Sequence, residues 1–375
     1  MLPRKLKILF IVLEMDTGGL QRMVNLLIQR IDKDRFEPYI CCLDRRGVFF
    51  VTAQSNCAGT FVLERRPGVF DWRLFVKLCR IIKDNNIDII HSHNGCSFYA
   101  ALSGCLARVR GIIHTDHGRL VPDKKGAILE DRISSYMMDY IVCVSEALSK
   151  YMAATVKIAR SKLLTIINGV DISTFIPVSL NKKRDLRISL GFSDNDKIIG
   201  TVCRLDPIKN LSFLIDCIPT IKYKIPNVKI VIVGDGECRN SLMSQVQMRG
   251  LNNTIKFLGQ REDIESILPS FDVYACTSLS EGTSMTILEA MACGLPIIAS
   301  GVGGNVELVD DTNGIVFPLN NSDAFVEGVI SLLLHKDVRL DKGKKSRRRI
   351  EDKYSLNQTV NKYEQLYISL SNSRL

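Results

Sequence analysis

The sequence predicts an α/β protein with two similar domains, each built on a parallel β-sheet that is covered by helices. Its 375 residues suffice for two domains at roughly 150 residues each. Short apolar runs alternate with helical segments from one end of the chain to the other. The runs are almost continuously apolar, which is typical of strands buried on both faces of a parallel sheet.

The expected strands form two series. The first-half strands are expected at residues 7–13, 39–43, 60–63, 87–91, 111–114, 140–144 and 163–167. The second-half strands are expected at residues 198–202, 229–233, 255–258, 273–277, 297–300 and 314–317. A polar, basic stretch over 168–196 separates the two series and predicts a linker. We therefore expect domains over residues 1–175 and 176–355, and a C-terminal helix over 356–375 that can pack back on the first domain.

The composition is that of an ordinary globular protein. Hydrophobic residues make up 46% and charged residues 24%, which excludes a disordered, collagen-like or coiled-coil chain. The net charge is +10. Residues 1–175 contain 25 basic and 17 acidic residues, whereas residues 176–375 contain 25 and 23. The first half is therefore the half expected to meet an anionic partner.

Neither a membrane span nor a disulfide-bonded secreted protein is indicated. No apolar run approaches the ~18–20 residues of a membrane-spanning helix. The chain begins as a signal peptide would, but the apolar run over 8–13 leads directly to acidic residues, which favours a buried first strand. The 12 cysteines are scattered without a Cys-x-x-Cys pair, as expected for buried thiols of a cytoplasmic protein.

The most informative segment is residues 277–300, TSLSEGTSMTILEAMACGLPIIAS. A strand is expected to end near Thr277, and a loop leads to a helix from about Thr283 to Cys293, where a glycine and a proline stop it. A helix N-terminus with small side chains attracts anions through its dipole and its N–H groups. The amides expected to do so belong to Thr283, Ser284, Met285 and Thr286.

Two glutamates accompany this element. Glu281 and Glu289 are eight residues apart, which corresponds to roughly 12 Å along a helix axis. That distance is about the span of a diphosphate with a sugar on each side, so each carboxylate could hydrogen-bond one sugar. The alternative is a capping carboxylate followed by a solvated glutamate, and the spacing alone does not decide between the two.

Basic residues and glycines follow other predicted strands. Arg204 follows the strand over 198–202, and Lys209 begins the next helix, so both would lie where a diphosphate needs charged donors. Gly18 and Gly19 lie between the first strand and the first helix, where they allow a ligand to approach the backbone. Neither this pair nor the later GDG segment meets the dinucleotide fingerprint G-x-G-x-x-G.

Four of the five histidines occur as two pairs, HSH and HTDH, and each pair is expected to follow a strand of the first sheet. No fitting third ligand accompanies them, so no metal is expected. His117 precedes a glycine and lies past its strand, hence in the cleft that two such sheets would form. His114 lies inside the strand. The active-site histidine is therefore His117 or His114.

Several motifs together resemble one family. The block EGTSMTILEAMACGLPIIAS is similar to the Glu-x7-Glu signature of glycosyltransferase family 4, whose members are retaining enzymes of the GT-B fold. The flanking pieces occur in that family's order over nearly the whole chain: TGGLQRMV, INGVD, TVCRLDPIKN, VIVGDGE, FLGQ and VGGNVELV. The resemblance implies two Rossmann-like domains that face a cleft. It also implies sugar transfer from a nucleoside diphosphate sugar with retained anomeric configuration.

The resemblance implies roles on the donor side of the reaction. Arg204 and Lys209 match the pair that holds the donor diphosphate and supports the leaving group, together with the amides at 283–286. Glu289 matches the carboxylate that binds the nucleotide ribose. Glu281 matches the carboxylate that contacts the donor sugar.

The remaining implied roles lie in the first domain. Gly19, with Gly18 beside it, matches a loop near the diphosphate and the acceptor, and His117 matches a histidine near the reacting sugar. The family needs no metal or other cofactor. The chain departs from the family at Cys203, where glycine usually precedes the arginine.

The implied partners are a nucleotide-sugar donor, most often a UDP-sugar, and a glycan or lipid-linked acceptor in cell-surface polysaccharide biosynthesis. No nucleic-acid partner is expected. The basic first domain adds the hypothesis of a cytoplasmic enzyme held peripherally on the anionic inner face of a membrane. Two alternatives remain: a non-hydrolysing nucleotide-sugar epimerase and an inactive sugar-nucleotide-binding subunit. The presence of all the implied catalytic residues argues against the inactive subunit.

Overall fold

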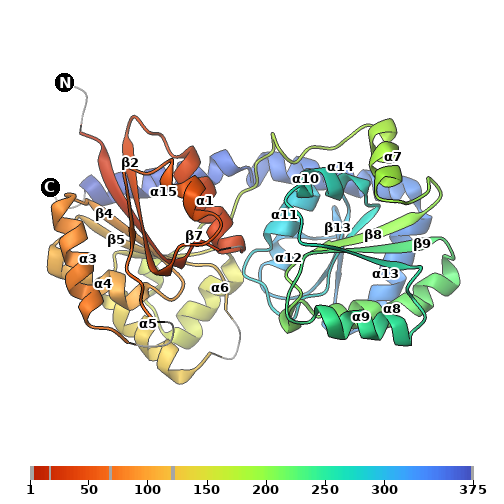
Figure 1. The fold of residues 1–375 in the computed structure, drawn as a ribbon, viewed down its shortest axis with the longest axis horizontal. Coiled ribbons are helices and arrows are strands. Elements are labelled where there is room, and N and C mark those ends of the chain that lie inside the picture. Colours follow the sequence, from red (N-terminus) through yellow and green to blue (C-terminus); the bar gives the residue numbers. More distant parts are fainter. Residues whose placement is uncertain (1–3, 17, 67–69, 120–122, 373–375) are drawn as a thin grey trace. The chain divides into compact units, whose positions relative to one another are not determined.

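A computed structural model of the chain describes residues 4–16, 18–66, 70–119 and 123–372. The chain divides into two compact units (Figure 1). The first unit comprises Met1–Asn168 with Asn357–Leu375, and the second comprises Gly169–Leu356. The chain therefore enters the second unit after Asn168 and returns to the first at its C-terminal helix.

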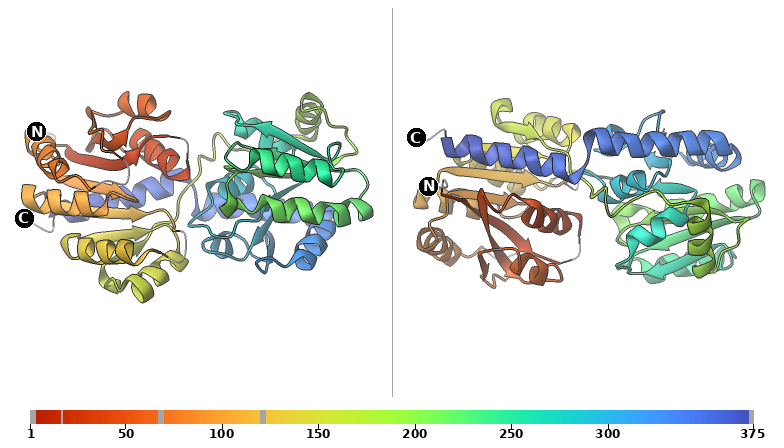
Figure 2. Two further views of the ribbon diagram at one scale, coloured as in Figure 1. Left: turned by 60° about the horizontal axis from the view of Figure 1, so that its bottom comes forward. Right: turned by 90° about the horizontal axis from the view of Figure 1, so that it is seen from above.

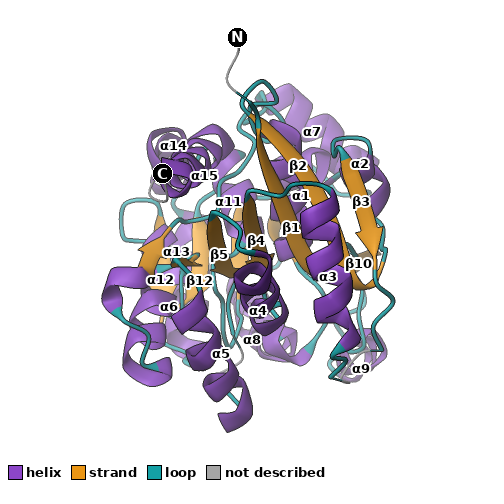
Figure 3. Cartoon of the chain, turned by 90° about the vertical axis from the view of Figure 1, so that its left-hand side faces the viewer, coloured by secondary structure: helices purple, strands orange, loops and turns teal. Residues whose placement is uncertain are grey.

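The first unit contains a parallel sheet of seven strands in the order β3-β2-β1-β4-β5-β6-β7. Figure 3 shows β1 to β5 of this sheet. Its strands are β1 Leu6–Glu14, β2 Phe36–Arg45, β3 Gly59–Val62, β4 Ile89–His93, β5 Gly111–Asp116, β6 Tyr140–Cys143 and β7 Leu163–Thr165. Its α-helices are α1 Gly19–Arg30, α2 Phe50–Gln54, α3 Arg73–Asp84, α4 Ser97–Ala107, α5 Lys125–Met137, α6 Glu146–Tyr151 and most of α15 Leu356–Asn372. A π-turn over Met152–Val156 and a 3-10 turn over Arg160–Lys162 connect α6 to β7.

Different helices cover the two faces of this sheet because side chains alternate along each strand. Leu9 and Ile11 of β1 share a buried cluster with residues of α3 and α4. On the opposite face, the ring of Phe36 lies 5.9 Å from that of Tyr367 of α15. Figure 2 shows α15 running along the sheet of the first unit. The C-terminal helix thus supplies part of the first unit's core.

The second unit contains a parallel sheet of six strands in the order β10-β9-β8-β11-β12-β13. Its strands are β8 Lys197–Val202, β9 Val228–Val233, β10 Ile255–Gly259, β11 Val273–Cys276, β12 Ile297–Ser300 and β13 Gly314–Phe317. Its α-helices are α7 Leu180–Ser189, α8 Leu211–Lys224, α9 Arg239–Met248, α10 Ile264–Ile267, α11 Met285–Ala292, α12 Asn305–Leu308, α13 Ser322–Leu334 and α14 Lys336–Lys353. No helix within the described ranges is both long and apolar enough to cross a membrane.

The strand order reverses once in each sheet, between β1 and β4 in the first unit and between β8 and β11 in the second. In open parallel sheets, ligands bind at the carboxyl ends of the strands beside this switch point. All the strands expected from the sequence are present, with ends shifted by up to three residues. The expected candidate residues therefore fall near the two switch points.

The prediction of a linker over 168–196 is wrong for its central part, which forms α7. The hydroxyl of Ser179 caps this helix by accepting a backbone N–H of the first turn. Arg187 is buried, and its guanidinium lies 2.7 Å from a carboxylate oxygen of Asp272. Because α7 is held in place by a buried ion pair, it needs few apolar side chains. Its polar sequence therefore did not show the apolar pattern of a helix.

Candidate active site

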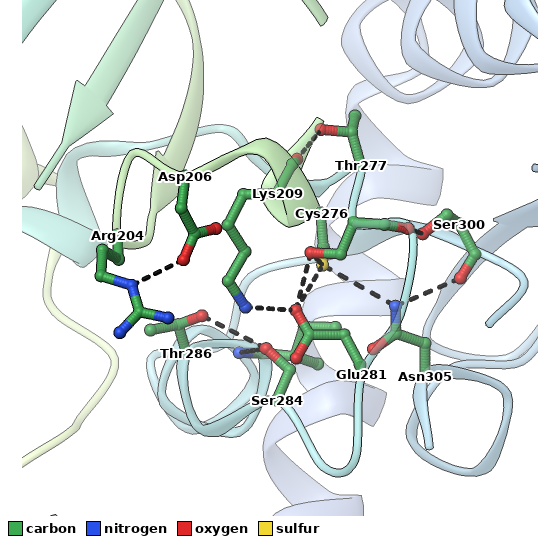
Figure 4. A network of polar contacts seen from close by, with 12 residues as sticks. Arg204, Asp206, Lys209, Cys276, Thr277, Glu281, Ser284, Thr286, Ser300 and Asn305 are labelled. Atoms are coloured by element: carbon green, nitrogen blue, oxygen red, sulfur yellow. Dashed lines mark hydrogen bonds and ion pairs between the residues drawn. The ribbon is translucent and has the colours of Figure 1, made fainter. Parts of the chain in front are cut away.

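The candidate site of the second unit is built from three segments at the carboxyl ends of β8 and β11 (Figure 4). Residues 203–209 follow β8 and end in a single 3-10 turn, Pro207–Lys209. Residues 277–284 follow β11, and α11 comes next. Because β8 and β11 are paired at the switch point, the segments that follow them lie side by side.

The centre of this site is an ion pair between Lys209 and Glu281. Nζ of Lys209 lies 2.8 Å from Oε1 of Glu281, which also accepts a 2.7 Å hydrogen bond from the hydroxyl of Ser278. The lysine and glutamate side chains are only 23% and 10% exposed. Burial opposes the charged form of Lys209, but the Glu281 carboxylate outweighs it, and the pKa of Lys209 is raised. Lys209 is therefore charged at physiological pH.

Hydrogen bonds to the backbone fix the loops that carry this pair. The hydroxyl of Thr277 donates to the carbonyl of Lys209 at 3.0 Å. The hydroxyl of Ser300, at the end of β12, donates to the carbonyl of Ser278 at 2.6 Å. The position of Glu281 relative to Lys209 is thus set by backbone contacts as well as by charge.

Arg204 is the exposed cation of the site. Its side chain is 69% exposed, and its Nε lies 2.6 Å from Oδ2 of Asp206. This pairing orients the planar guanidinium while most of it stays open to solvent. The preceding residue, Cys203, is partly buried, and burial raises the pKa of its thiol to about 12. The thiol of Cys203 therefore stays protonated and adds no charge to the site.

Helix α11 begins later than the sequence predicts. Its first residue is Met285 rather than Thr283, because Ser284 acts as the N-cap and its hydroxyl accepts the N–H of Ile287. The amides of Met285 and Thr286 belong to the first turn, where N–H groups have no partner within the helix. Thr283 and Ser284 precede the helix, so only half of the four expected amides are helical.

The helical spacing expected between the two glutamates is also wrong. Glu281 lies in the loop ahead of α11, whereas Glu289 lies in the middle of the helix with an exposed fraction of 1%. The helical rise therefore does not set their separation. Glu289 is not the solvated glutamate of the alternative interpretation.

Sequence reasoning missed residues that shape the site. A Cβ at Gly303, whose φ is +49°, would lie 1.8 Å from the carbonyl oxygen of Glu281. A Cβ at Gly234 would lie 1.9 Å from the carbonyl oxygen of Cys203. The side chain of Asn305 donates to the sulfur at the end of β11 and to a carbonyl at the end of β12. Glycines at or shortly after strand ends were the available signal for the first two.

The structure corrects the expectation that both histidine pairs follow strands. His91 and His93 lie inside β4, and His114 lies inside β5, whereas His117 follows β5. Polar partners make this burial possible; the hydroxyl of Ser92, for example, lies 2.9 Å from Nδ1 of His114. Within the part of the chain that the structure describes, no group of three or more His, Cys, Asp or Glu side chains could hold a metal ion.

His117 lies against His93. Nε2 of His117 is 2.9 Å from Nδ1 of His93. The backbone N–H of His117 donates to the side-chain oxygen of Asn94 at 2.7 Å. Burial, with a smaller effect of the nearby His114, lowers the pKa of His117 to about 3. The His117 ring is therefore neutral at physiological pH.

The glycine pair lies at the switch point of the first sheet. Gly18 is the N-cap of α1, and Gly19 is the first residue of that helix. The φ of Gly18 is 173°, an extended backbone that any residue can adopt, so conformation does not require glycine there. The pair places a helix N-terminus beside the end of β1.

The two units together form the GT-B fold of glycosyltransferases, as expected from the sequence. Anabaena HepE, solved in complex with UDP, has the same fold with a TM-score of 0.85. That structure is 22% identical to this chain, and the match covers 97% of this chain and 100% of HepE.

The chain belongs to glycosyltransferase family 4 and is a glycosyltransferase. Residues 17–174 match the model described as Glycosyltransferase Family 4, and residues 182–350 match the model described as Glycosyl transferases group 1. The UDP-Gal:alpha-D-GlcNAc-diphosphoundecaprenol alpha-1,3-galactosyltransferase of Escherichia coli is 27% identical over 98% of this chain and 97% of its own length. An uncharacterized glycosyltransferase of Methanocaldococcus jannaschii is 29% identical over 80% of this chain and 82% of its own length.

Proposed function

We propose that this enzyme transfers a sugar from a UDP-sugar to a lipid-linked or polysaccharide acceptor, with retention of the anomeric configuration. The E. coli relative supports this proposal, since its name gives UDP-Gal as the donor and a diphosphoundecaprenol-linked sugar as the acceptor. The HepE complexes with UDP and with UDP-glucose support the same donor class. The observation that carries the proposal is the ion pair of Lys209 and Glu281 beside the exposed Arg204.

In this proposal, the second unit holds the donor diphosphate. The ammonium of Lys209 and the guanidinium of Arg204 bind the phosphates as charged donors, and the first-turn amides of Met285 and Thr286 add the positive end of the α11 dipole. Negative charge grows on the diphosphate as its bond to the anomeric carbon breaks. Fixed donors stabilise that charge without reorganising during the reaction.

The two glutamates bind the sugars of the donor. Glu289 hydrogen-bonds the ribose, as in the family pattern. Oε1 of Glu281 already accepts hydrogen bonds from Lys209 and Ser278. We therefore assign Oε2 of Glu281 to a hydroxyl of the transferred sugar.

The acceptor oxygen forms its bond to the anomeric carbon on the face that the diphosphate leaves, so the configuration is retained. The proton of the acceptor hydroxyl passes to an oxygen of the leaving phosphate. His117 is neutral and orients the reacting sugar rather than accepting this proton, while Gly19 and Gly18 leave room near the diphosphate and the acceptor. The two cations and the helix N-terminus supply the positive charge, so we propose that the reaction needs no metal.

The enzyme is further proposed to work in the cytoplasm at the anionic inner face of a membrane, where a lipid-linked acceptor would lie. Lys124 and Lys125 support this, because both are exposed at the start of α5 in the basic first half of the chain. Each such residue near an anionic surface contributes about 1 kcal/mol to the free energy of membrane binding. Binding through the first unit would be salt-sensitive.

A screen of UDP-, GDP- and ADP-sugars by thermal shift tests the donor, followed by product analysis with GlcNAc-diphosphoundecaprenol as acceptor. The expected result is stabilisation by UDP and a UDP-sugar, and an α-linked product from an α-configured donor. Stabilisation by GDP-sugars alone, an inverted product, or epimerisation of UDP-GlcNAc without an acceptor would each contradict the proposal.

A further inference from the structure

A buried polar layer lies between the first sheet and α15. His91 and His93 alternate with Ser92 along β4, so both point to the face that α15 covers. Nδ1 of His91 lies 2.7 Å from the hydroxyl of Tyr367, and its Nε2 lies 2.7 Å from the hydroxyl of Thr115. Both ring nitrogens of His91 are therefore satisfied by the fold itself.

His93 differs from its neighbour in this respect. It is 2% exposed, and its Nδ1 lies 2.9 Å from Nε2 of His117. Among the described residues, no hydrogen-bond partner is found for the other nitrogen of either ring, Nε2 of His93 and Nδ1 of His117. Buried polar atoms are almost always paired, so two orphaned nitrogens at the ends of one hydrogen bond need an explanation.

The hydrogen bond between the two rings restricts where their protons can lie. Each neutral imidazole carries one N–H, and the bond uses one of them. The remaining N–H is therefore on Nδ1 of His117 or on Nε2 of His93. A buried N–H without a partner is costly. Nδ1 of His117 and Nε2 of His93 are both buried, but the rest of the His117 residue is partly exposed whereas His93 is enclosed as a whole. A ligand can therefore approach His117 more readily than His93, and the remaining N–H is less costly on His117.

We propose that His93 is a positioning residue that donates its Nδ1–H to Nε2 of His117, so that His117 presents its own Nδ1–H to an oxygen of the sugar substrate. The inference rests on the proposed role of His117 in sugar transfer, and it specifies that role as hydrogen-bond donation rather than proton abstraction. Protonating the pair would place N–H groups at both orphaned ends, which the burial of His93 opposes. The lowered pKa values of both rings agree with a neutral pair.

Asn94 completes the positioning of His117 from the same strand end. Its side-chain oxygen accepts the N–H of His117 at 2.7 Å, and its side-chain nitrogen donates to the carbonyl of Gly118 at 3.0 Å. Asn94 thus fixes the backbone at His117, while His93 contacts the His117 ring. His93 and Asn94, the last two residues of the motif HSHN, therefore both position His117.

Nitrogen NMR of ¹⁵N-histidine-labelled enzyme tests the tautomer without any substrate. Signals are assigned with the His117→Gln and His93→Asn variants. Between about pH 6 and 8, where an unperturbed histidine would titrate, His117 should remain the Nδ1–H tautomer, with and without UDP-glucose. A His117 ring that carries its proton on Nε2, or that becomes charged in this range, would overturn the inference while leaving the proposed donor site intact.

Turnover of His93 variants tests the consequence. His93→Leu removes the donor and should lower UDP release from the active UDP-sugar by about 10- to 100-fold, because a misplaced group is costly in rate. His93→Asn keeps an N–H near the place of Nδ1 and should recover most of that loss. The matched control is Tyr367→Phe, which also removes a buried hydrogen bond from this layer but does not touch His117; it should lower Tm and spare turnover.

Equal turnover in His93→Leu and Tyr367→Phe would overturn the inference, as would a His93→Asn variant that folds but is no better than His93→Leu. Full turnover in His117→Ala is a different outcome. It would refute the role of His117 in the proposed function, and the tautomer measurement would show whether the hydrogen bond itself was assigned correctly.

Discussion

The switch points of the two sheets offer a direct comparison. At the first, Nε2 of His117 lies 2.9 Å from Nδ1 of His93. At the second, Nζ of Lys209 lies 2.8 Å from Oε1 of Glu281. Burial acts against charge at both places, yet it leaves His117 neutral and Lys209 charged. The difference is the partner. A carboxylate offsets the cost of burying the lysine, whereas no carboxylate of the described residues offsets the burial of His117. Parallel sheets of similar topology can therefore carry a neutral hydrogen-bonding site or a charged one.

Removing the positive charge of Lys209 at the second switch point should have the largest effect on turnover. Lys209→Met keeps the length of the side chain but removes the cation and leaves Glu281 with a buried charge. Loss of one preorganised stabilising contact costs roughly 2.7–4 kcal/mol, or about 10²–10³ in turnover. Lys256→Met is a suitable control, because Lys256 donates to the carbonyl of Leu190, outside the site. Steady-state assays giving near wild-type turnover for Lys209→Met would show that the charged site is wrongly assigned.

A change of backbone should perturb the same site without removing any polar group. Gly303→Ala would place a Cβ 1.8 Å from the carbonyl of Glu281, so the loop must move. A displacement on the order of 1 Å can cost about 100-fold in rate. Gly250→Ala is the matched control, since its φ is +64° but nothing lies within 4 Å of the added atom. If both variants lose stability and turnover equally, the close approach at Gly303 has no role of its own.

The two switch points should respond to pH in opposite directions. The pKa of Lys209 is raised above 10.5, so its contribution to stability is complete below that pH and is lost as the pH rises through the folded value. The pKa of His117 is lowered from 6.5 to about 3. Its contribution is complete above about pH 6.5 and is lost as the pH falls, by at most about 1.4 kcal/mol per pH unit for each group.

Hydrogen exchange detected by mass spectrometry can follow the two regions separately. Between about pH 6.5 and 4.5, where histidines titrate before most carboxylates, the peptides of β4 and β5 should lose protection first, after correction for intrinsic exchange. Protection that falls first in β8 and β11 would contradict the neutral state assigned to the first switch point.

The smallest effect is expected when exposed lysines of the first unit are replaced, and it concerns membrane binding. Lys124→Glu with Lys125→Glu should weaken co-sedimentation with phosphatidylglycerol vesicles by about 1 kcal/mol per residue at low salt. The same change at Lys344 and Lys345, which are exposed on α14 of the second unit, alters the net charge equally and should have less effect. Equal weakening by both pairs would mean that only net charge matters.

The sequence predicted the sheets well because buried parallel strands are short, apolar and bounded by turn residues. It was less successful where polar contacts decide the structure. The start of α11 depends on capping by Ser284, α7 depends on the buried pair of Arg187 and Asp272, and β4 runs through His91 and His93 because polar partners receive them. The partners of Arg187 and His91 are distant in sequence, so no local pattern could have indicated them, whereas the cap at Ser284 contacts Ile287 only three residues later and was a local signal.

The candidate site shows the same division. Arg204 and Lys209 were predictable because they follow a strand, whereas the support from Ser278 and Gly303 comes from another loop and another strand end. The pairing of His93 with His117 likewise requires the register between β4 and β5. Residues that carry charge could be predicted from the sequence, and residues that position them required the structure.

Calorimetric titration with UDP in the presence of EDTA tests the central claim most directly, namely that a metal-free cationic site in the second unit holds the donor diphosphate. We predict that the wild-type enzyme binds UDP in EDTA, and that Lys209→Met weakens binding by at least about 10-fold, or about 1.4 kcal/mol. Binding that requires added Mg²⁺ or Mn²⁺, or that is equally tight in Lys209→Met, would contradict it.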